Sequence, residues 1–163
     1  MFEIQLFGRL EVRTRGIRLS GADFGGDRPR HLLALLALRG EMSTSELAEL
    51  LCTPKKTIET DLSVLRHHLE PGSGSRDSVV VGHRGRYVLH PDRVRVDVAR
   101  FDELIAAAAS RPAPRAVKPL TAAAFVASRP LLEDEDAPWA AEARAEYRAK
   151  LVMARLADVT QVI

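Results

Sequence analysis

The stretch from residue 53 to residue 69 constrains the fold more than any other part of this sequence. Four apolar residues recur there at intervals of three or four, which places them on one face of a helix: Ile58, Leu62, Leu65 and Leu69. Thr53 as N-cap and Pro54 as first helical residue predict where this helix begins. The opposite face would carry mostly polar side chains: Lys56, Thr60, Ser63, Val64 and His67. Such a helix suits the major groove of DNA, and the alternative is an ordinary amphipathic surface helix.

The elements that precede this helix predict a small α+β domain. Alternating apolar residues at 2–7, 10–15 and 16–19 predict a short antiparallel sheet. A leucine-rich run at 27–39 predicts a central, buried helix that stops at Gly40. Ser43 and Glu46 form a capping box, which predicts that a second helix begins there and reaches about Cys52.

A hairpin is predicted to follow the third helix. Residues 72–75 are a Gly/Ser-rich link, and residues 78–90 are two apolar runs on either side of a basic turn at 83–86. Strands, three helices and a hairpin are the order of a winged helix, a variant of the helix-turn-helix. We therefore predict a winged-helix domain at residues 1–96, with its recognition helix at 54–69 and its wing at 82–87.

The remaining residues, 97–163, are predicted to form an all-α domain. Helices are expected at 98–109, at 119–128 and from Pro138 to the end, with breaks at 111–114 and 129–130. The acidic run at 133–136 is expected only to solvate a loop and to favour the next helix. The last helix has an apolar stripe, which predicts a covering partner, either a second copy or the remainder of a longer chain: Trp139, Ala143, Tyr147, Leu151, Leu156, Val159 and Ile163.

Composition limits the classes of function. The chain of 163 residues is 46% hydrophobic, so it can bury a core, and 5% aromatic, which argues against a surface that stacks single-stranded bases. Because the net charge is only +2, nucleic-acid binding would depend on where charges lie. The single cysteine, Cys52, is expected to be a small core residue in a reducing, cytoplasmic compartment. Without a signal pattern or a run of about 18 apolar residues, no membrane association is expected.

No catalytic motif is present in the sequence. There is no Gly-rich phosphate loop, no nucleophile elbow and no zinc-ligand spacing, so we expect neither an enzyme nor a cofactor. His67 and His68 do not suggest a metal site, because adjacent residues on a helix do not converge.

The candidate DNA contacts are cations at two helix starts and on the wing, together with the outer face of the third helix. The cations would hold phosphates, while Thr60, Ser63 and His67 would meet base edges. The full set is Arg28, Arg30, Lys55, Lys56, Thr60, Ser63, Val64, Arg66, His67, Arg84 and Arg86.

Several motifs, in their order and spacing, resemble activators of the Streptomyces antibiotic regulatory protein (SARP) type. They are Leu6-Phe7-Gly8, the leucine-rich residues 29–38, residues 62–69, residues 85–89, residues 97–104, and residues 129–132 with 137–140. The resemblance implies an OmpR-like winged helix followed by a partial bacterial transcriptional activator domain, which is tetratricopeptide-like (TPR-like). It also implies transcription regulation, with a third helix in the major groove of double-stranded DNA, a wing on the minor groove, and recruitment of RNA polymerase.

The sequence departs from that family at three places. Val64 stands where a basic residue is usual, Glu59 and Asp61 put acids on the third helix, and the connection at Cys52-Thr53 is short. The acids on the third helix and the low net charge favour the alternative function, a degenerate winged helix that serves as a protein-interaction or dimerisation module, whereas the basic wing and the resemblance favour DNA binding.

Overall fold

The structure is a computed structural model that describes residues 1–74 and 77–162, with side chains as far as Val159. Two compact units make up the chain. The first, called here the winged unit, contains residues 1–4 and 10–95, and the second, the helical unit, contains residues 5–9 and 96–163. The end of the predicted link, Ser75, and the end of the predicted stripe, Ile163, lie outside the described residues. The independent folding of 1–96 and 97–163 stays a prediction.

The predicted antiparallel strands are present at the start of the chain. They are β1 (Phe2–Gln5), β2 (Glu11–Thr14) and β3 (Ile17–Ser20), and β2 pairs antiparallel with β3 so that Val12 faces Leu19. Phe2, Ile4 and Val12 are buried, as their alternation predicts. A strand that the pattern did not predict, β7 (Val94–Val96), completes the sheet order β3-β2-β1-β7.

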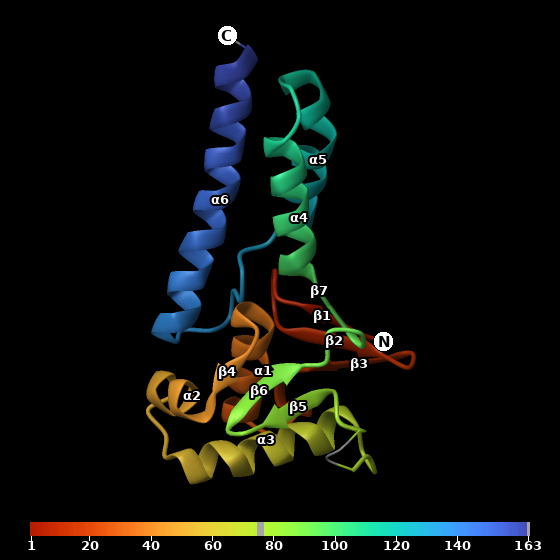
Figure 1. Cartoon of the computed structure of the whole chain (residues 1–163), viewed down its shortest axis with the longest axis vertical. Helices are drawn as coiled ribbons and strands as arrows, with labels where there is room; N and C mark the ends of the chain where they lie inside the picture. Colours follow the sequence, from red (N-terminus) through yellow and green to blue (C-terminus); the bar gives the residue numbers. More distant parts are fainter. Residues whose placement is uncertain (75–76, 163) are drawn as a thin grey trace. The chain divides into compact units, whose positions relative to one another are not determined.

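Three helices form the centre of the winged unit (Figure 1). They are α1 (Asp27–Arg39), α2 (Thr44–Leu50) and α3 (Lys55–Leu69), and a short 3-10 helix, η1 (Gly21–Phe24), precedes them. α1 is central and buries four leucines: Leu32, Leu33, Leu35 and Leu36. The predicted capping box is confirmed, because Ser43 Oγ accepts from the Glu46 N–H at 3.0 Å and Glu46 Oε1 accepts from the Ser43 N–H at 3.4 Å.

The predicted hairpin is also present. Its strands are β5 (Val80–His83) and β6 (Arg86–Leu89), and the turn between them has φ of 49° at Arg84 and 74° at Gly85. Positive φ at both central residues is the turn that matches the twist of a two-residue hairpin. β4 (Met42–Ser43) pairs with β6 and makes a three-stranded sheet, which the sequence did not predict because two residues show no periodicity.

The helical unit consists of α4 (Asp97–Ala109), α5 (Ala113–Val126) and α6 (Pro138–Val162) (Figure 1). The predicted start of the second of these helices, residue 119, was wrong. α5 begins at Ala113, with Pro112 as N-cap and a proline in its first turn, where no N–H is needed. Pro119 lies inside α5 on its buried face, so packing retains a helix that the missing N–H weakens.

Residues 5–9 belong to the helical unit because long-range bonds hold them there. Both carboxylate oxygens of Asp97 accept from the Leu6 N–H, at 2.9 and 3.0 Å, and one accepts from the Phe7 N–H at 3.0 Å. Phe7 also packs against the rings of Phe101 and Tyr147, at 5.4 and 5.8 Å between centroids. Burial raises the pKa of Asp97 above its ordinary value, although these N–H groups act in the opposite direction.

Three further predictions need correction. Cys52 is exposed and has φ of 49°, because it lies in the turn after α2 rather than inside that helix. Thr53 is not the N-cap of α3: Pro54 takes that position, and the Thr53 hydroxyl donates to the Leu51 carbonyl instead. The acidic run does more than solvate a loop, since Glu133 pairs with Arg129 and Glu135 is buried.

Of the helices that the structure describes, none combines the length and the apolar character that crossing a membrane demands.

Candidate nucleic-acid interface

The two faces of α3 divide as its sequence predicts. Ile58, Leu62, Leu65 and Leu69 are at most 1% exposed. The outer face exposes Lys55 and Lys56 in the first turn, and farther along it exposes Thr60, Ser63 and His67. The buried stripe therefore fixes this helix to the winged unit and leaves a polar surface free for a ligand.

Val64 is the exception on that outer face. It is half-buried, and a Cβ added to Gly25 would lie 2.5 Å from Val64 Cγ1. Gly25 also has φ of 97°, so both its backbone and its surroundings require glycine. Val64 therefore packs against the loop between η1 and α1, which limits what it can offer to a ligand.

The hydroxyls of Thr60 and Ser63 turn back onto their own helix. Thr60 donates to the Lys56 carbonyl at 3.1 Å, and Ser63 donates to the Glu59 carbonyl at 3.2 Å. Each hydroxyl donates its proton within α3, so only its oxygen lone pairs are available to a ligand. Both residues can therefore accept hydrogen bonds from a ligand.

Asp61 does not face outward with the other acid of α3. It is 7% exposed, and its Oδ2 accepts from Arg28 Nε at 2.7 Å. Residue 61 follows Ile58 by three positions and precedes Leu65 by four, so it lies at the edge of the buried stripe, facing α1. The sequence grouped Asp61 with Glu59 as an acid of the third helix, whereas the Asp61 carboxylate is buried and paired with Arg28. Its spacing from the buried residues Ile58 and Leu65 was the sequence signal that could have predicted its inward position.

The six cations that the sequence places at two helix starts and on the wing are called here the phosphate clamp. Three of them already have acidic partners. Besides Arg28, Arg30 pairs with Asp27 at 2.8 Å and lowers the pKa of that carboxyl through a hydrogen bond and its charge. Arg86 has its Nε 3.3 Å from Glu41 and its Nη1 3.8 Å from Glu46.

Three cations of the predicted clamp have exposed side chains and no such partner within residues 1–74 and 77–162: Lys55, Lys56 and Arg84. Lys55 and Lys56 occupy the first turn of α3, where Pro54 provides no side-chain cap for the free N–H groups. Arg84 lies at the tip of the wing. Free N–H groups and cations together attract anions such as phosphate.

Arg66 joins α3 to the wing. Its Nε and Nη2 donate to the Val80 carbonyl at 3.0 and 2.8 Å, and its guanidinium lies 5.8 Å from the centre of the Tyr87 ring. A Cβ on Gly82 would meet Tyr87 at 2.7 Å, so glycine is required where the ring crosses the strand. The sequence placed Arg66 among the DNA contacts, whereas its hydrogen bonds hold β5 of the hairpin to α3.

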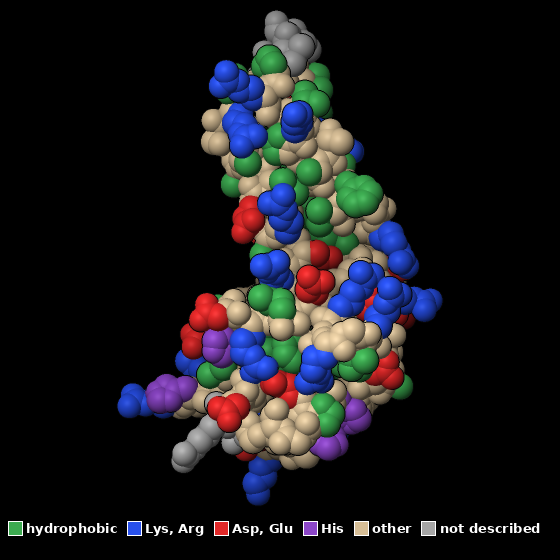
Figure 2. All heavy atoms as spheres, turned by 90° about the vertical axis from the view of Figure 1, so that its right-hand side faces the viewer, with side chains coloured by type: hydrophobic (Ala, Val, Ile, Leu, Met, Phe, Trp, Pro, Cys, Tyr) green, Lys and Arg blue, Asp and Glu red, His purple; other side chains and the backbone are tan. Residues whose placement is uncertain are grey.

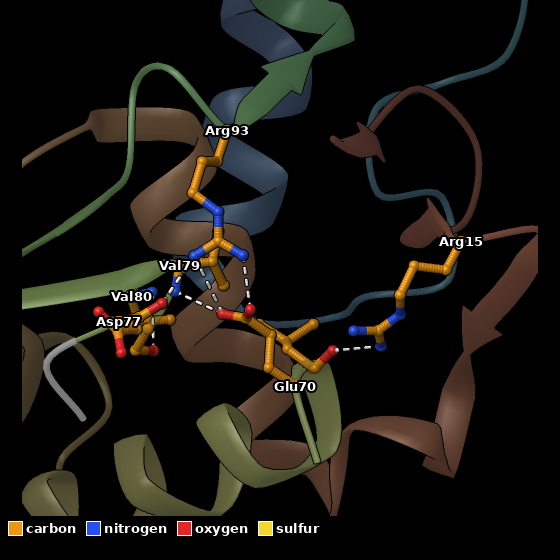
Figure 3. Close-up of polar contacts among 8 residues, drawn as sticks. Arg15, Glu70, Asp77, Val79, Val80 and Arg93 are labelled. Atoms are coloured by element: carbon orange, nitrogen blue, oxygen red, sulfur yellow. Dashed lines mark hydrogen bonds and ion pairs between the residues drawn. The ribbon is translucent and has the colours of Figure 1, made fainter. Parts of the chain in front are cut away.

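A second group of contacts between α3 and the hairpin lies at the end of α3 and centres on Glu70 (Figure 3). Its carboxylate accepts from Arg93 at 2.5 Å and from the Val79 N–H at 2.6 Å, just before β5. Arg93 also donates to the Asp77 carbonyl, and Arg15 donates to the Leu69 carbonyl. Burial alone would raise the pKa of Glu70, but Arg93 and the Val79 N–H outweigh it and lower that pKa below its ordinary value. No sequence pattern indicates this group, because the partners of Glu70 lie 9 and 23 residues away.

Beside the wing lies a polar hollow of about 400 Å³, lined among others by Arg66, His83, Arg84 and Tyr87. Two arginines, Arg66 and Arg84, are the charged side chains of its lining. On the face drawn in Figure 2, lysine and arginine side chains lie interspersed with aspartate and glutamate side chains. Any polyanion would therefore be held by a few placed cations rather than by a broad field.

The sequence matches no family model and no curated protein. Among solved structures, Mycobacterium tuberculosis EmbR in complex with a low-affinity phosphopeptide is similar in fold, with a TM-score of 0.76 at 23% sequence identity. The match covers 96% of this chain and 44% of that chain, so this chain spans less than half the length of its structural neighbour. The predicted fold class, a winged helix followed by a helical segment, is confirmed.

Proposed function

We propose that this protein is a transcriptional regulator that binds double-stranded DNA through the outer face of α3 and the tip of the wing. The observation that carries this proposal is the exposed polar face of a helix whose other face is completely buried, with Lys55 and Lys56 at its start, which pair with no acid among the described residues. The likeness in fold to EmbR supports it. We further expect that the protein regulates transcription by recruiting RNA polymerase.

The proposed contacts differ in role. Lys55, Lys56 and Arg84 hold phosphates, because their charges have no acidic partner among the described residues. Thr60 and Ser63 offer acceptor oxygens to base amino groups, and His67 extends the same face. Arg28, Arg30 and Arg86 contribute only by exchanging their carboxylate partners for phosphate, so we place them outside the main set.

The wing can keep its position beside α3 because it is attached at several points. Met42 and Ser43 pair with β6, and the Gly85 carbonyl accepts from both the N–H and the hydroxyl of Thr44, at 2.8 and 3.0 Å. Arg66 and Glu70 attach β5 from the other side. Such preorganisation lowers the conformational cost of binding.

The test is a titration of the full chain with duplex DNA over a range of salt concentrations. Three phosphate contacts predict that log affinity falls with log salt at a slope of about −3. The double variant Lys55→Gln, Lys56→Gln should reduce the magnitude of the slope by about two. The matched control, Arg39→Gln with Arg95→Gln, removes the same charge from two exposed positions of the winged unit and should leave the slope nearly unchanged.

A sharper comparison uses the two wing arginines. Arg84→Gln should reduce the magnitude of the slope by about one, whereas Arg86→Gln should change it little because Glu41 and Glu46 already neutralise Arg86. Equal losses in both variants, or none in either, would contradict the proposed contact set. Circular dichroism of each variant checks that the fold is intact.

The second candidate function is a protein-interaction module. The mixed charge of the surface, the exposed Glu59 on α3 and the neutralised clamp arginines favour it. If wild-type protein shows no salt-dependent binding to duplex DNA, while Lys56→Ala abolishes binding to a protein partner, this second function replaces the first.

A further inference from the structure

The helical unit contains a groove that takes no part in the proposed DNA contacts. It has a volume of about 250 Å³ and lies between α6 and the segment that links α5 to α6. Apolar side chains line its base, among them Phe7, Leu131, Tyr147 and Leu151. The first three are buried and Leu151 is partly exposed, so the base is part of the core of the helical unit and is firmly built.

Four arginines line the same groove, and two of them serve the unit itself. Arg129 pairs with Glu133, which leaves that pair neutral. Arg144 donates to the carbonyls of Leu131 and Glu135, both at 2.8 Å, and so closes the loop before α6. These two arginines therefore stabilise the wall of the groove.

The other two arginines, Arg148 and Arg155, are exposed, and neither has a hydrogen bond or ion pair to any residue that the structure describes. They lie seven residues apart on α6, with Val152 between them on the same face and 48% exposed. Seven residues of helix correspond to about 10 Å, so the groove has two free cations about 10 Å apart beside an apolar base.

We propose that this groove binds an acidic amphipathic helix of a partner protein. Two carboxylates seven residues apart on such a helix match the spacing of Arg148 and Arg155, and the apolar residues between them would cover Val152 and Leu151. Charge complementarity selects acidic side chains, since both free charges are positive. The apolar base selects against a nucleic-acid backbone, whose sugars and phosphates would leave it uncovered.

This site is separate from the proposed DNA contacts, none of which lies in the helical unit. Its binding can therefore fail while DNA binding holds, and the reverse. The partner is defined by its chemistry as an acidic helix. This definition does not depend on which DNA the winged unit binds.

The experiment is a fluorescence anisotropy titration of the full chain with a short labelled synthetic peptide. The peptide is helical and carries two glutamates seven residues apart with leucines between them. We expect saturable binding that weakens as salt is raised, because the carboxylate–guanidinium pairs are partly screened. The same peptide with glutamines in place of the glutamates should bind at least about fivefold more weakly.

Variants place the binding in the groove. Arg148→Gln with Arg155→Gln should weaken peptide binding about five- to tenfold. The matched control is Arg111→Gln with Arg115→Gln, which removes the same charge from exposed positions elsewhere in the helical unit and should leave the affinity unchanged. Val152→Ser should weaken binding by a smaller factor, since it removes apolar contact without touching charge.

Three outcomes would overturn the proposal. One is no saturable binding of the acidic peptide by the wild-type chain. Another is an equal loss in the Arg111/Arg115 control, which would mean binding by general charge. The third is a loss of duplex DNA affinity in the Arg148/Arg155 variant with peptide binding intact, which would make the groove a backbone contact. Unchanged circular dichroism in each variant shows that a loss of binding is not a loss of fold.

Discussion

The helices α3 and α6 use the same kind of amphipathic pattern with opposite results. α3 buries its whole apolar stripe, and no residue of that stripe is more than 1% exposed. α6 buries Trp139 and Tyr147 in its first half but leaves large apolar residues 48–65% exposed in its second: Val152, Met153, Leu156 and Val159. The second half of α6 packs on α4 and α5 through Ala154, so the four exposed residues lie outside that contact face.

The difference shows what each helix can bind. A helix with a completely buried stripe presents only its polar face, so its ligand has to be recognised by charge and hydrogen bonds. A helix with exposed apolar residues has area left to bury, so its partner is expected to be another protein surface. The self-association that the sequence suggested for residues 97–163 thus stays a prediction, with the exposed second half of α6 as the surface it would use.

The largest expected contrast is in stability. Leu65→Ala in α3 removes a fully buried side chain and should lower the free energy of unfolding by about 2–5 kcal/mol. Leu156→Ala in α6 removes a side chain that is 56% exposed and should change it by no more than about 0.5 kcal/mol. Urea denaturation of both variants measures the difference. A large loss in Leu156→Ala would show that the second half of α6 is covered in solution.

A smaller contrast separates the two acids of α3. Asp61→Ala removes the buried partner of Arg28 and should lower the free energy of unfolding by about 1–3 kcal/mol. Glu59→Ala should leave stability nearly unchanged, because Glu59 is exposed, and should strengthen non-specific DNA binding by removing a charge near phosphate. If Asp61→Ala left stability unchanged and strengthened DNA binding as Glu59→Ala does, Asp61 would face the ligand after all.

The smallest contrast concerns pH and compares Glu70 with Asp97. Glu70 has a folded-state pKa below its ordinary value of 4.5, so it stabilises the winged unit above about that pH, and this stabilisation is lost as pH falls through the folded-state pKa. Asp97 has a folded-state pKa above its ordinary value of 3.8, so the helical unit gains stability as pH falls through that raised pKa. Acidification below about pH 4.5 should therefore weaken hydrogen-exchange protection in α3 before it weakens protection in α4.

Two variants test the cause of this difference. Glu70→Gln should remove the loss of protection in α3 on acidification, and Asp97→Asn should remove the gain in α4. Fluorescence of the single tryptophan, Trp139, reports on the helical unit alone and provides an independent measure. Parallel loss of protection in both helices would contradict the opposite pKa shifts.

The candidate site shows how far sequence reasoning reaches. The exposed and buried faces of α3 and the exposed wing arginine follow from periodicity and turn chemistry, which depend on residues only a few positions apart. Which cations are free could not be predicted in this way. The partners of Arg28, Arg66 and Arg86 lie 14 to 45 residues away, and each pairing exists only because the fold brings two elements together.

By itself, the sequence determined the local structure: the three helices of the winged unit, the capping box at Ser43, and the hairpin of the wing. These depend on backbone propensity and on bonds between near neighbours, which a pattern records directly. Only the tertiary structure decided the rest. It paired β4 and β7 with distant strands, bound Leu6 to Asp97 across 91 residues, turned Asp61 inward and left Arg148 free. The physical reason is that burial and pairing depend on which surfaces meet, and no single segment carries that information.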